Sequence, residues 1–287
     1  MADHPAALKT VGETLRKSAQ LFEHLPNGRL DAEVLLAHVL TADRAELYRA
    51  PERTLSPPQS AHVDKLCRAR AAGEPLAYLV GETEFWSLRL KITADVLVPR
   101  PATETLVEHA LRLADAEGYG SVIDLGTGSG AIAAALGHER KHLAITVTDY
   151  SARSLDVARL NLRELGVDNV HCVRSDWLRP FARAQVDMIV CNPPYIDRHA
   201  TETFDDALRF EPAAALFAEE HGMAAITQVA AAARTVLRPG GALVLEHGFD
   251  QQTAVTNLMR DLDYAAIGTA RDLDGHPRIC FAFTRAG

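Results

Sequence analysis

The chain has 287 residues, of which 47% are hydrophobic, so it is long enough to bury one large core or two smaller ones. The net charge is −8, and because residues 1–80 hold equal numbers of acidic and basic side chains, the excess negative charge lies after residue 80. No run of Lys or Arg is longer than two, which argues against a nucleic-acid-binding protein.

The sequence contains no pattern typical of a membrane protein, a metal site or a disulfide framework. No apolar stretch reaches the roughly 18 to 20 residues of a membrane span, and the N-terminus lacks a signal-peptide pattern, so we expect a cytoplasmic protein. No long apolar seam is present, and we expect a monomer. Four cysteines lie far apart and outside any CxxC pattern, which predicts reduced thiols: Cys67, Cys172, Cys191 and Cys280.

The first 80 residues predict a small helical bundle. The first helix carries a narrow stripe at spacings of four and three residues, in which only Ser18 is polar: Val11, Leu15, Ser18, Phe22 and Leu25. A second helix is expected behind Asp31 as its N-cap, with Leu35, Leu36, Val39 and Leu40 on its apolar face. The segment "SPPQS" predicts the start of a third helix, whose inward residues are Val63, Leu66 and Cys67.

Residues 81–100 predict a β-hairpin linker, because apolar residues alternate in "EFWSLRLKI" and "DVLVP". Pro101 then suits the first turn of a helix. From residue 120, apolar β-rich runs alternate with amphipathic helices, which predicts an α/β fold with a mostly parallel sheet. The last two runs, "YAAIGTA" and "RICFAF", are joined by a segment too short for a crossover helix and should pair antiparallel.

A glycine-rich loop, "DLGTGSG", follows the first strand of this α/β region and opens a helix. It contains Asp124, Gly126, Thr127, Gly128, Ser129 and Gly130. Glycines at the carboxyl end of a parallel strand let the backbone approach a bound nucleotide closely. The spacing is GxGxG rather than the GxGxxG of dinucleotide sites, and the carboxylate of Asp124 suits a cationic ligand better than a pyrophosphate. The loop therefore favours S-adenosylmethionine as the ligand.

Two further acidic residues follow strands and support this interpretation. Asp149 ends the second strand, where a carboxylate can accept hydrogen bonds from both ribose hydroxyls. Asp176 and Trp177 follow the third strand, where they can meet the adenine amino group and cover the base. We therefore expect a class I S-adenosylmethionine-dependent methyltransferase with a Rossmann-like, seven-stranded sheet.

The segment "VCNPPYI" interrupts a buried strand with Asn192, Pro193, Pro194 and Tyr195. The rigid turn would let the Asn192 side-chain oxygen and the Pro193 carbonyl each accept one hydrogen of a planar NH2 group, with Tyr195 against its flat face. Held in this way, a weakly nucleophilic nitrogen would point its lone pair at the methyl group. The turn alone leaves the acceptor open between glutamine amides and the amino groups of adenine or cytosine.

Nine stretches in order resemble the protein-(glutamine-N5) methyltransferases that modify peptide chain release factors, the HemK or PrmC family. They include "GEPLAYLVGETEFWSL", "VIDLGTGSGAIA", "VDMIVCNPPYI", "FEPAAALFAEEHG", "LRPGGALVLEHGFDQ" and "RDLDGHPR". The resemblance implies that the glycine loop, Asp149, Trp177 and Asn192 bind S-adenosylmethionine. It also implies that residues 192–195 hold the glutamine of the Gly-Gly-Gln motif in release factors.

The resemblance further implies three parts: a helical substrate-recognition domain (1–80), the hairpin linker (81–100) and a methyltransferase domain (101–287). Two positions depart from the family pattern, Ala102 in place of an acidic residue and Tyr150-Ser151 in place of a smaller apolar start to the next helix. The alternatives are an N6-adenine methyltransferase of DNA or RNA, a methyltransferase acting on a ribosomal-protein glutamine, and a non-catalytic binding module. The acidic charge and the intact Asn-Pro-Pro-Tyr turn weigh against the first and the last.

Overall fold

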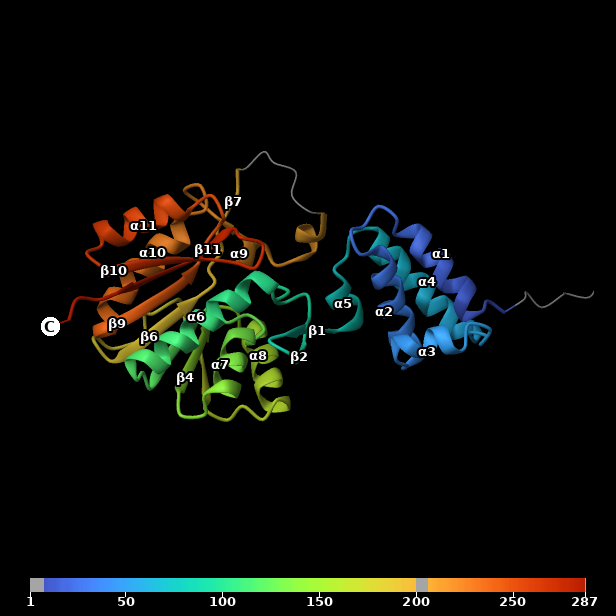
Figure 1. Ribbon diagram of the computed structural model, residues 1–287, viewed down its shortest axis with the longest axis horizontal. Helices are drawn as coiled ribbons and strands as arrows, with labels where there is room; N and C mark the ends of the chain where they lie inside the picture. Colours follow the sequence, from blue (N-terminus) through green and yellow to red (C-terminus); the bar gives the residue numbers. More distant parts are fainter. Residues whose placement is uncertain (1–7, 200–205, 287) are drawn as a thin grey trace, which may run out of the picture. The chain divides into compact units, whose positions relative to one another are not determined.

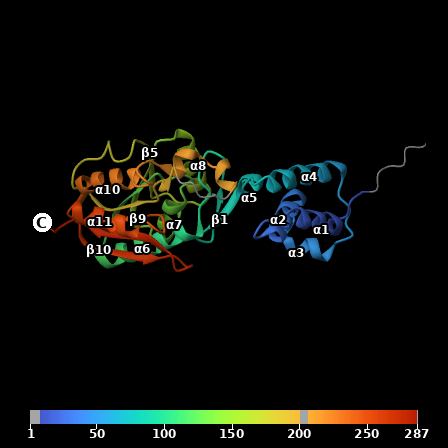
Figure 2. The ribbon, with the colours of Figure 1, turned by 90° about the horizontal axis from the view of Figure 1, so that it is seen from above.

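The computed structural model of the protein describes residues 8–199 and 206–286, and these form two compact units. One unit comprises the described residues up to Gly81 together with residues 206–210, and the other contains the rest of the described chain. Figures 1 and 2 show the helical character of the first unit and the sheet of the second. The hairpin at residues 82–91 clusters with the second unit, while the three-part division of the chain stays a prediction.

The first unit packs its helices around one apolar core. Its elements are α1 (Val11–Leu21), α2 (Gly28–Leu40), α3 (Arg44–Arg49), α4 (Pro57–Ala71), α5 (Leu76–Val80) and a 3-10 helix (Asp206–Phe210). Capping boxes at Thr10 and Ser56 satisfy the first amides of α1 and α4. The start of α2 requires glycine, because a Cβ at Gly28 would lie 2.1 Å from the Phe22 carbonyl oxygen. The core includes Val11, Phe22, Leu35, Leu36, Leu40, Val63, Leu66 and Cys67.

The expected N-cap role of Asp31 is wrong. Helix α2 starts four residues earlier than expected, with Asn27 at the N-cap, and Asp31 lies within its first turn. The Asp31 side chain is only 7% exposed and accepts a hydrogen bond from Arg70 Nε at 2.7 Å. A buried carboxylate needs such a partner, so Asp31 ties α2 to α4 instead of capping α2.

Asp31→Ala is expected to destabilise the first unit by about 3 kcal/mol, because it leaves the Arg70 guanidinium largely buried without its counter-ion. Hydrogen exchange of α2 and α4 amides measures this change as a lower opening free energy. Asp64→Ala is the matched control, since the Lys9–Asp64 pair is 36% and 42% exposed. It should cost less than about 1 kcal/mol. Equal protection in the two variants would contradict a structural role for the buried pair.

The second unit begins with the hairpin of β1 (Glu82–Phe85) and β2 (Leu88–Lys91). Its two-residue turn has positive φ at Trp86 (54°) and Ser87 (57°), the backbone that a tight hairpin turn needs. The prediction that "DVLVP" forms a strand is wrong, because residues 95–99 have no strand pairing. They begin in a turn, in which the Val96 amide donates to the Thr93 carbonyl at 3.2 Å, and continue without regular structure to α6 (Pro101–Glu117), which opens at Pro101 as expected.

A seven-stranded sheet forms the core of the second unit, in the order β10-β11-β9-β6-β3-β4-β5. Its strands are β3 (Ser121–Leu125), β4 (Ala144–Asp149), β5 (Val170–Arg174), β6 (Val186–Cys191), β9 (Leu237–Glu246), β10 (Ala265–Arg271) and β11 (Pro277–Phe283). Strands β9, β6, β3, β4 and β5 are parallel, and β11 runs antiparallel to both of its neighbours. The predicted α/β fold with an antiparallel last strand is confirmed.

Helices cover both faces of this sheet (Figure 1). Helix α7 (Ala131–Glu139) contacts both α6 and α8 (Ala152–Glu164), and α10 (Ala224–Val236) contacts α11 (Gln252–Asp261). Ile123, Leu125 and Ile189 pack against α10 and α11. Because side chains alternate between the two faces of a sheet, the residues between them in β3 and β6 face α6, α7 and α8. The described part of the chain contains no helix with both the length and the apolar character that a membrane crossing requires.

The strand order places a ligand site beside β3 and β6. From β3 the chain moves to β4 on one side, whereas from β6 it moves to β9 on the other. Where neighbouring connections diverge like this, a crevice opens at the carboxyl ends of the strands. The glycine loop follows β3 and the Asn-Pro-Pro-Tyr turn follows β6, so both lie at this crevice. A short parallel pair, β7 (Ile196–Asp197) and β8 (Phe217–Ala218), and helix α9 (Ala213–Leu216) follow along the chain.

Candidate active site

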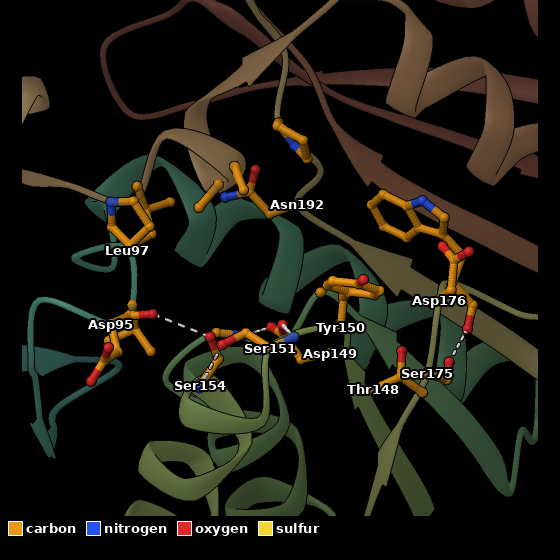
Figure 3. Close-up of a pocket in the computed structure, with 18 of the residues that line it drawn as sticks. Asp95, Leu97, Thr148, Asp149, Tyr150, Ser151, Ser154, Ser175, Asp176 and Asn192 are labelled. Carbon is orange, nitrogen blue, oxygen red and sulfur yellow. Dashed lines mark hydrogen bonds between the residues drawn. The ribbon is translucent and has the colours of Figure 1, made fainter.

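A cavity of about 470 Å³ lies at the carboxyl ends of β3, β4 and β6. Figure 3 shows the side chains that border it, with Asn192 and Leu97 on one side and Asp149, Tyr150 and Ser151 on another. Seven residues predicted for the site line it: Gly126, Gly128, Asp149, Asp176, Trp177, Asn192 and Pro194. Six others lie next to these but are not among its lining residues: Asp124, Thr127, Ser129, Gly130, Pro193 and Tyr195.

The glycine loop owes its shape to left-handed backbone at alternate positions. Gly126, Gly128 and Gly130 have φ of 66°, 54° and 82°, values that only glycine adopts readily. A Cβ at Gly130 would also lie 3.1 Å from the Ala158 Cβ, so α7 and α8 approach closely there. The glycines of the GxGxG loop therefore have two roles. Gly126 and Gly128 allow the backbone to border the cavity, and Gly130 allows α7 to pack closely against α8.

Asp124 lies fully buried beneath this loop. Its Oδ2 accepts a hydrogen bond from the Thr127 hydroxyl at 2.6 Å, whereas Oδ1 has no partner among the described residues. Burial raises the pKa of Asp124 to about 7, and the Thr127 hydroxyl and the Ala133 amide only partly oppose that rise. A cationic group brought close to this buried carboxylate would stabilise it.

Asp149 connects the end of β4 to the glycine loop. Its carboxylate accepts hydrogen bonds from the Gly128 amide at 3.0 Å and from the Ser151 amide at 2.8 Å. Burial raises its pKa, and these backbone donors oppose the shift. The side chain thus holds two cavity-lining segments together and still borders the cavity.

Asp176 and Trp177 border the cavity beyond β5. The Trp177 ring lies near the glycine loop, 3.8 Å from where a Gly126 Cβ would be, which is an ordinary van der Waals distance. Trp177 has a positive φ of 49°, an uncommon backbone for a bulky residue. Asp176 forms an ion pair with Arg179 at 3.2 Å. The two predicted base-contacting residues are therefore both at the cavity wall.

The turn after β6 is anchored by both of its polar side chains. Asn192 Nδ2 donates a hydrogen bond to Thr103 Oγ1 at 3.1 Å, which leaves the Asn192 oxygen available at the cavity. The Tyr195 hydroxyl donates to Glu246 Oε1 at 3.0 Å, and burial raises the pKa of Tyr195. Pro193 is buried and Pro194 borders the cavity.

Sequence reasoning missed the segments that close the cavity from the side. Ala94–Leu97 border it from the connection before α6, and Pro212, Ala214 and Ala215 border it from the segment at α9. Glu211 joins these segments, because its buried carboxylate accepts hydrogen bonds from Arg100 and, at 3.0 Å, from the Val98 amide. A charged residue between apolar neighbours in "RFEPAAAL" was the available signal.

The fold and the site together define a class of protein. The sheet order, the glycine loop after β3 and the acidic end of β4 are those of a class I S-adenosylmethionine-dependent methyltransferase. Among solved structures, the hMettl16 catalytic domain aligns over 81% of this chain and 83% of its own, at 14% identity and a TM-score of 0.55. A methyltransferase from Pyrococcus furiosus aligns over 81% and 100%, at 16% identity and a TM-score of 0.52.

The sequence relatives narrow this class to one family. Family models described as "Methyltransferase small domain" and "PrmC N-terminal domain" match residues 100–216 and 13–81. Release factor glutamine methyltransferases of Vibrio cholerae and Escherichia coli are 42% and 38% identical, over 96% and 92% of this chain and 94% and 95% of theirs. The chain belongs to the release factor glutamine methyltransferase family, and the resemblance seen in its motifs is confirmed.

Proposed function

We propose that this enzyme transfers a methyl group from S-adenosylmethionine to the side-chain amide nitrogen of the Gly-Gly-Gln glutamine in peptide chain release factors. Family membership supports the reaction. The orientation of the Asn192 side-chain amide supports a planar NH2 group as the methyl acceptor. Its nitrogen is committed to Thr103, so its oxygen is the atom that can accept a hydrogen from a planar NH2 group at the cavity.

Asn192, Pro193 and Tyr195 are the proposed catalytic residues. The Asn192 oxygen and the Pro193 carbonyl would each accept one hydrogen of the glutamine amide, with Pro194 stiffening the turn and Tyr195 against the flat face of the amide. An amide nitrogen is a poor nucleophile, so alignment with the methyl group is the main contribution the protein can make. The new N–CH3 bond would form as the S–CH3 bond breaks, with S-adenosylhomocysteine as the leaving group. The nitrogen becomes acidic only at that stage and its proton can pass to water, so no side chain has to act as a strong base.

S-adenosylmethionine supplies the electrophilic methyl group when it is bound. The chemistry of the cavity suits it: Asp149 offers a carboxylate for ribose hydroxyls, Asp176 an acceptor for an adenine amino group, and Trp177 an aromatic face. Asp124 offers an unpartnered buried oxygen toward a cationic group. We assign cofactor binding to the loop formed by Gly126, Thr127, Gly128, Ser129 and Gly130, and we assign Asn192 a contact to both ligands.

The affinity for S-adenosylmethionine is expected to rise between pH 5 and pH 7 and to level off above about pH 7. In the enzyme without ligand, the Asp124 side chain stays protonated up to about pH 7. Because a cationic ligand favours the charged carboxylate, binding at pH 6 should release a proton from Asp124. Calorimetry in two buffers of different ionisation enthalpy measures this release. It should vanish in Asp124→Asn, and an unchanged proton release in that variant would exclude Asp124 as its source.

The helical unit would supply recognition of the release factor, since a methyltransferase core does not need it. We propose that the enzyme acts as a cytoplasmic monomer with a protein substrate and without a nucleic-acid partner. The equal numbers of acidic and basic residues in 1–80, and the acidic balance of the remainder, support a protein partner over a polyanion.

A labelling assay tests the substrate. Methyl-labelled S-adenosylmethionine is incubated with the enzyme and purified release factor, with a release factor whose Gly-Gly-Gln glutamine is replaced by alanine, or with DNA. Label is expected only on the unaltered release factor. Label on DNA, or on the altered release factor at the same rate, would overturn the proposed acceptor.

A further inference from the structure

Gln251 lies between β9 and α11, and the proposed reaction does not use it. It occupies the N-cap position of α11, where Ser, Asp and similar residues commonly accept hydrogen bonds from the first helix amides. The Gln251 side chain makes no capping hydrogen bond, and the residue is 9% exposed. A buried amide group needs partners for its oxygen and its nitrogen, so the side chain has to find them in other segments.

The Gln251 amide has a partner for each of its polar atoms. Its Oε1 accepts a hydrogen bond from the Gly248 amide at 2.8 Å. Its Nε2 donates to the Tyr195 carbonyl at 3.0 Å and to the His221 carbonyl at 3.2 Å. A backbone amide only donates and a carbonyl only accepts, so the reversed orientation of the side chain would lose all three hydrogen bonds. Gln251 therefore joins the end of the Asn-Pro-Pro-Tyr turn to the segments that follow β9 and β8.

The segment after β8 approaches the Tyr195 carbonyl closely from a second side. A Cβ at Gly222 would lie 2.0 Å from the Tyr195 carbonyl oxygen and 2.6 Å from Gln251 Nε2. The φ of Gly222 is 81°, so this position requires glycine both for its backbone and for its lack of a side chain. The Tyr195 carbonyl is thus enclosed by Gln251 and by this segment.

The Asn-Pro-Pro-Tyr turn needs contacts of this kind because its two prolines supply no amide hydrogen. Pro193 and Pro194 cannot donate a hydrogen bond to a neighbouring segment. Tyr195 is instead held at both ends: its hydroxyl donates to Glu246 Oε1 at 3.0 Å, and its carbonyl accepts from Gln251 at 3.0 Å. With the ring tip and the backbone both held, the ring has little freedom to change its orientation.

We propose that Gln251 is a positioning residue for methyl transfer, which holds the Tyr195 carbonyl so that the Tyr195 ring lies against the flat face of the acceptor amide. This inference rests on the proposed role of Tyr195 at the acceptor. Gln251 is not among the residues that line the cavity, so in this scheme it touches neither cofactor nor substrate. Alignment of a weak nucleophile tolerates little displacement, so the loss of this anchor should slow methyl transfer and spare cofactor binding.

Gln251→Met tests the proposal, because it keeps the length of the side chain and removes all three hydrogen bonds. It is expected to lower kcat for release factor methylation at least about tenfold, with the Kd for S-adenosylmethionine within about twofold of wild type. Single-turnover kinetics and calorimetry measure the two quantities. A wild-type kcat would overturn the proposal. A Kd that weakens as much as kcat would reduce Gln251 to a general structural role and overturn it as well.

The double variant with Tyr195→Ala shows whether Gln251 acts through Tyr195. Tyr195→Ala alone is expected to lower kcat about tenfold or more, because the acceptor amide loses the ring against its face. Once the ring is absent, Gln251→Met should lower kcat less than about twofold further, since both changes remove the same positioned group. If the two losses multiply, Gln251 acts on another part of the site and the proposal is wrong.

Gln252→Met is the matched control. Gln252 is the adjacent glutamine, and its amide makes only a 3.4 Å contact to Thr269. Its kcat should stay within about twofold of wild type. Equal losses of kcat in Gln252→Met and Gln251→Met would indicate a disturbance of α11 and would contradict a specific role of Gln251.

A further measurement does not depend on the substrate. The two side-chain NH2 hydrogens of Gln251, assigned in NMR spectra by their loss in Gln251→Met, should both be protected from solvent exchange, because each is directed at a carbonyl. Rapid exchange of these hydrogens would refute the anchoring contact. Protected hydrogens together with no labelling of release factor would instead refute only the proposed function.

Discussion

Replacing Asn192 by alanine is expected to lower kcat for release factor methylation about a hundred- to a thousandfold, with a much smaller loss of affinity for S-adenosylmethionine. The variant removes one of the two acceptors proposed for the glutamine NH2 group, and losing one preorganised polar contact at a reacting group has an effect of this size in other enzymes. The cavity keeps Asp149, Asp176 and Trp177 for the cofactor, so binding of the methyl donor should persist. Single-turnover kinetics and calorimetry measure the two quantities separately.

Asn257→Ala is a suitable control, because Asn257 lies on α11 and makes an exposed contact to Arg260. It should leave both quantities unchanged. A wild-type kcat in Asn192→Ala would refute the role given to the Asn-Pro-Pro-Tyr turn. A Kd for S-adenosylmethionine weakened as much as kcat would assign Asn192 to cofactor binding instead.

Asp149→Ala is expected to weaken S-adenosylmethionine binding about ten- to a hundredfold. The carboxylate is proposed to accept hydrogen bonds from the ribose hydroxyls, and the expected total loss is that of one hydrogen bond to a charged group, about 1.5–3 kcal/mol. The variant also releases the Gly128 and Ser151 amides, so the glycine loop loses part of its support. Calorimetry gives the Kd directly.

Asp149→Asn separates these two effects, since it keeps an acceptor oxygen without the charge, and its Kd should fall between wild type and Asp149→Ala. Asp156→Ala is the surface control: Asp156 pairs with Arg159 on α8 and its side chain is 73% exposed. An unchanged Kd in Asp149→Ala would end the proposed ribose contact. An equal loss in Asp156→Ala would point to a general effect of reduced negative charge.

Local patterns in the sequence were sufficient for the elements that carry the site. The alternation of apolar runs and amphipathic helices predicted the sheet, and glycine or acidic residues directly after apolar runs predicted which residues lie at its carboxyl edge. Such signals work because parallel strands end at one edge of a sheet, so residues distant in sequence but equally placed on their strands come together. Gly126, Asp149, Trp177 and Asn192 reach one cavity for this reason.

The predictions that were wrong concern segments whose local sequence pattern is compatible with more than one structure. Asp31 has the residue type of an N-cap, yet the backbone at Gly28 can pack against Phe22, and α2 therefore starts earlier. The alternation in "DVLVP" is typical of a strand, but a strand needs a neighbour, and residues 95–97 border the cavity instead. Neither outcome can be read from residue type and spacing alone.

By itself the sequence determined the α/β fold, the glycine loop, the acidic strand ends and the Asn-Pro-Pro-Tyr turn, because periodicity and residue type act over a few neighbouring positions. Only the tertiary structure decided which polar groups face one another. Asn192 meets Thr103 from 89 positions earlier in the chain, and Tyr195 meets Glu246 from 51 positions later. Buried polar groups must find partners wherever packing brings them, so the direction of the Asn192 amide depends on how α6, β6 and β9 come together.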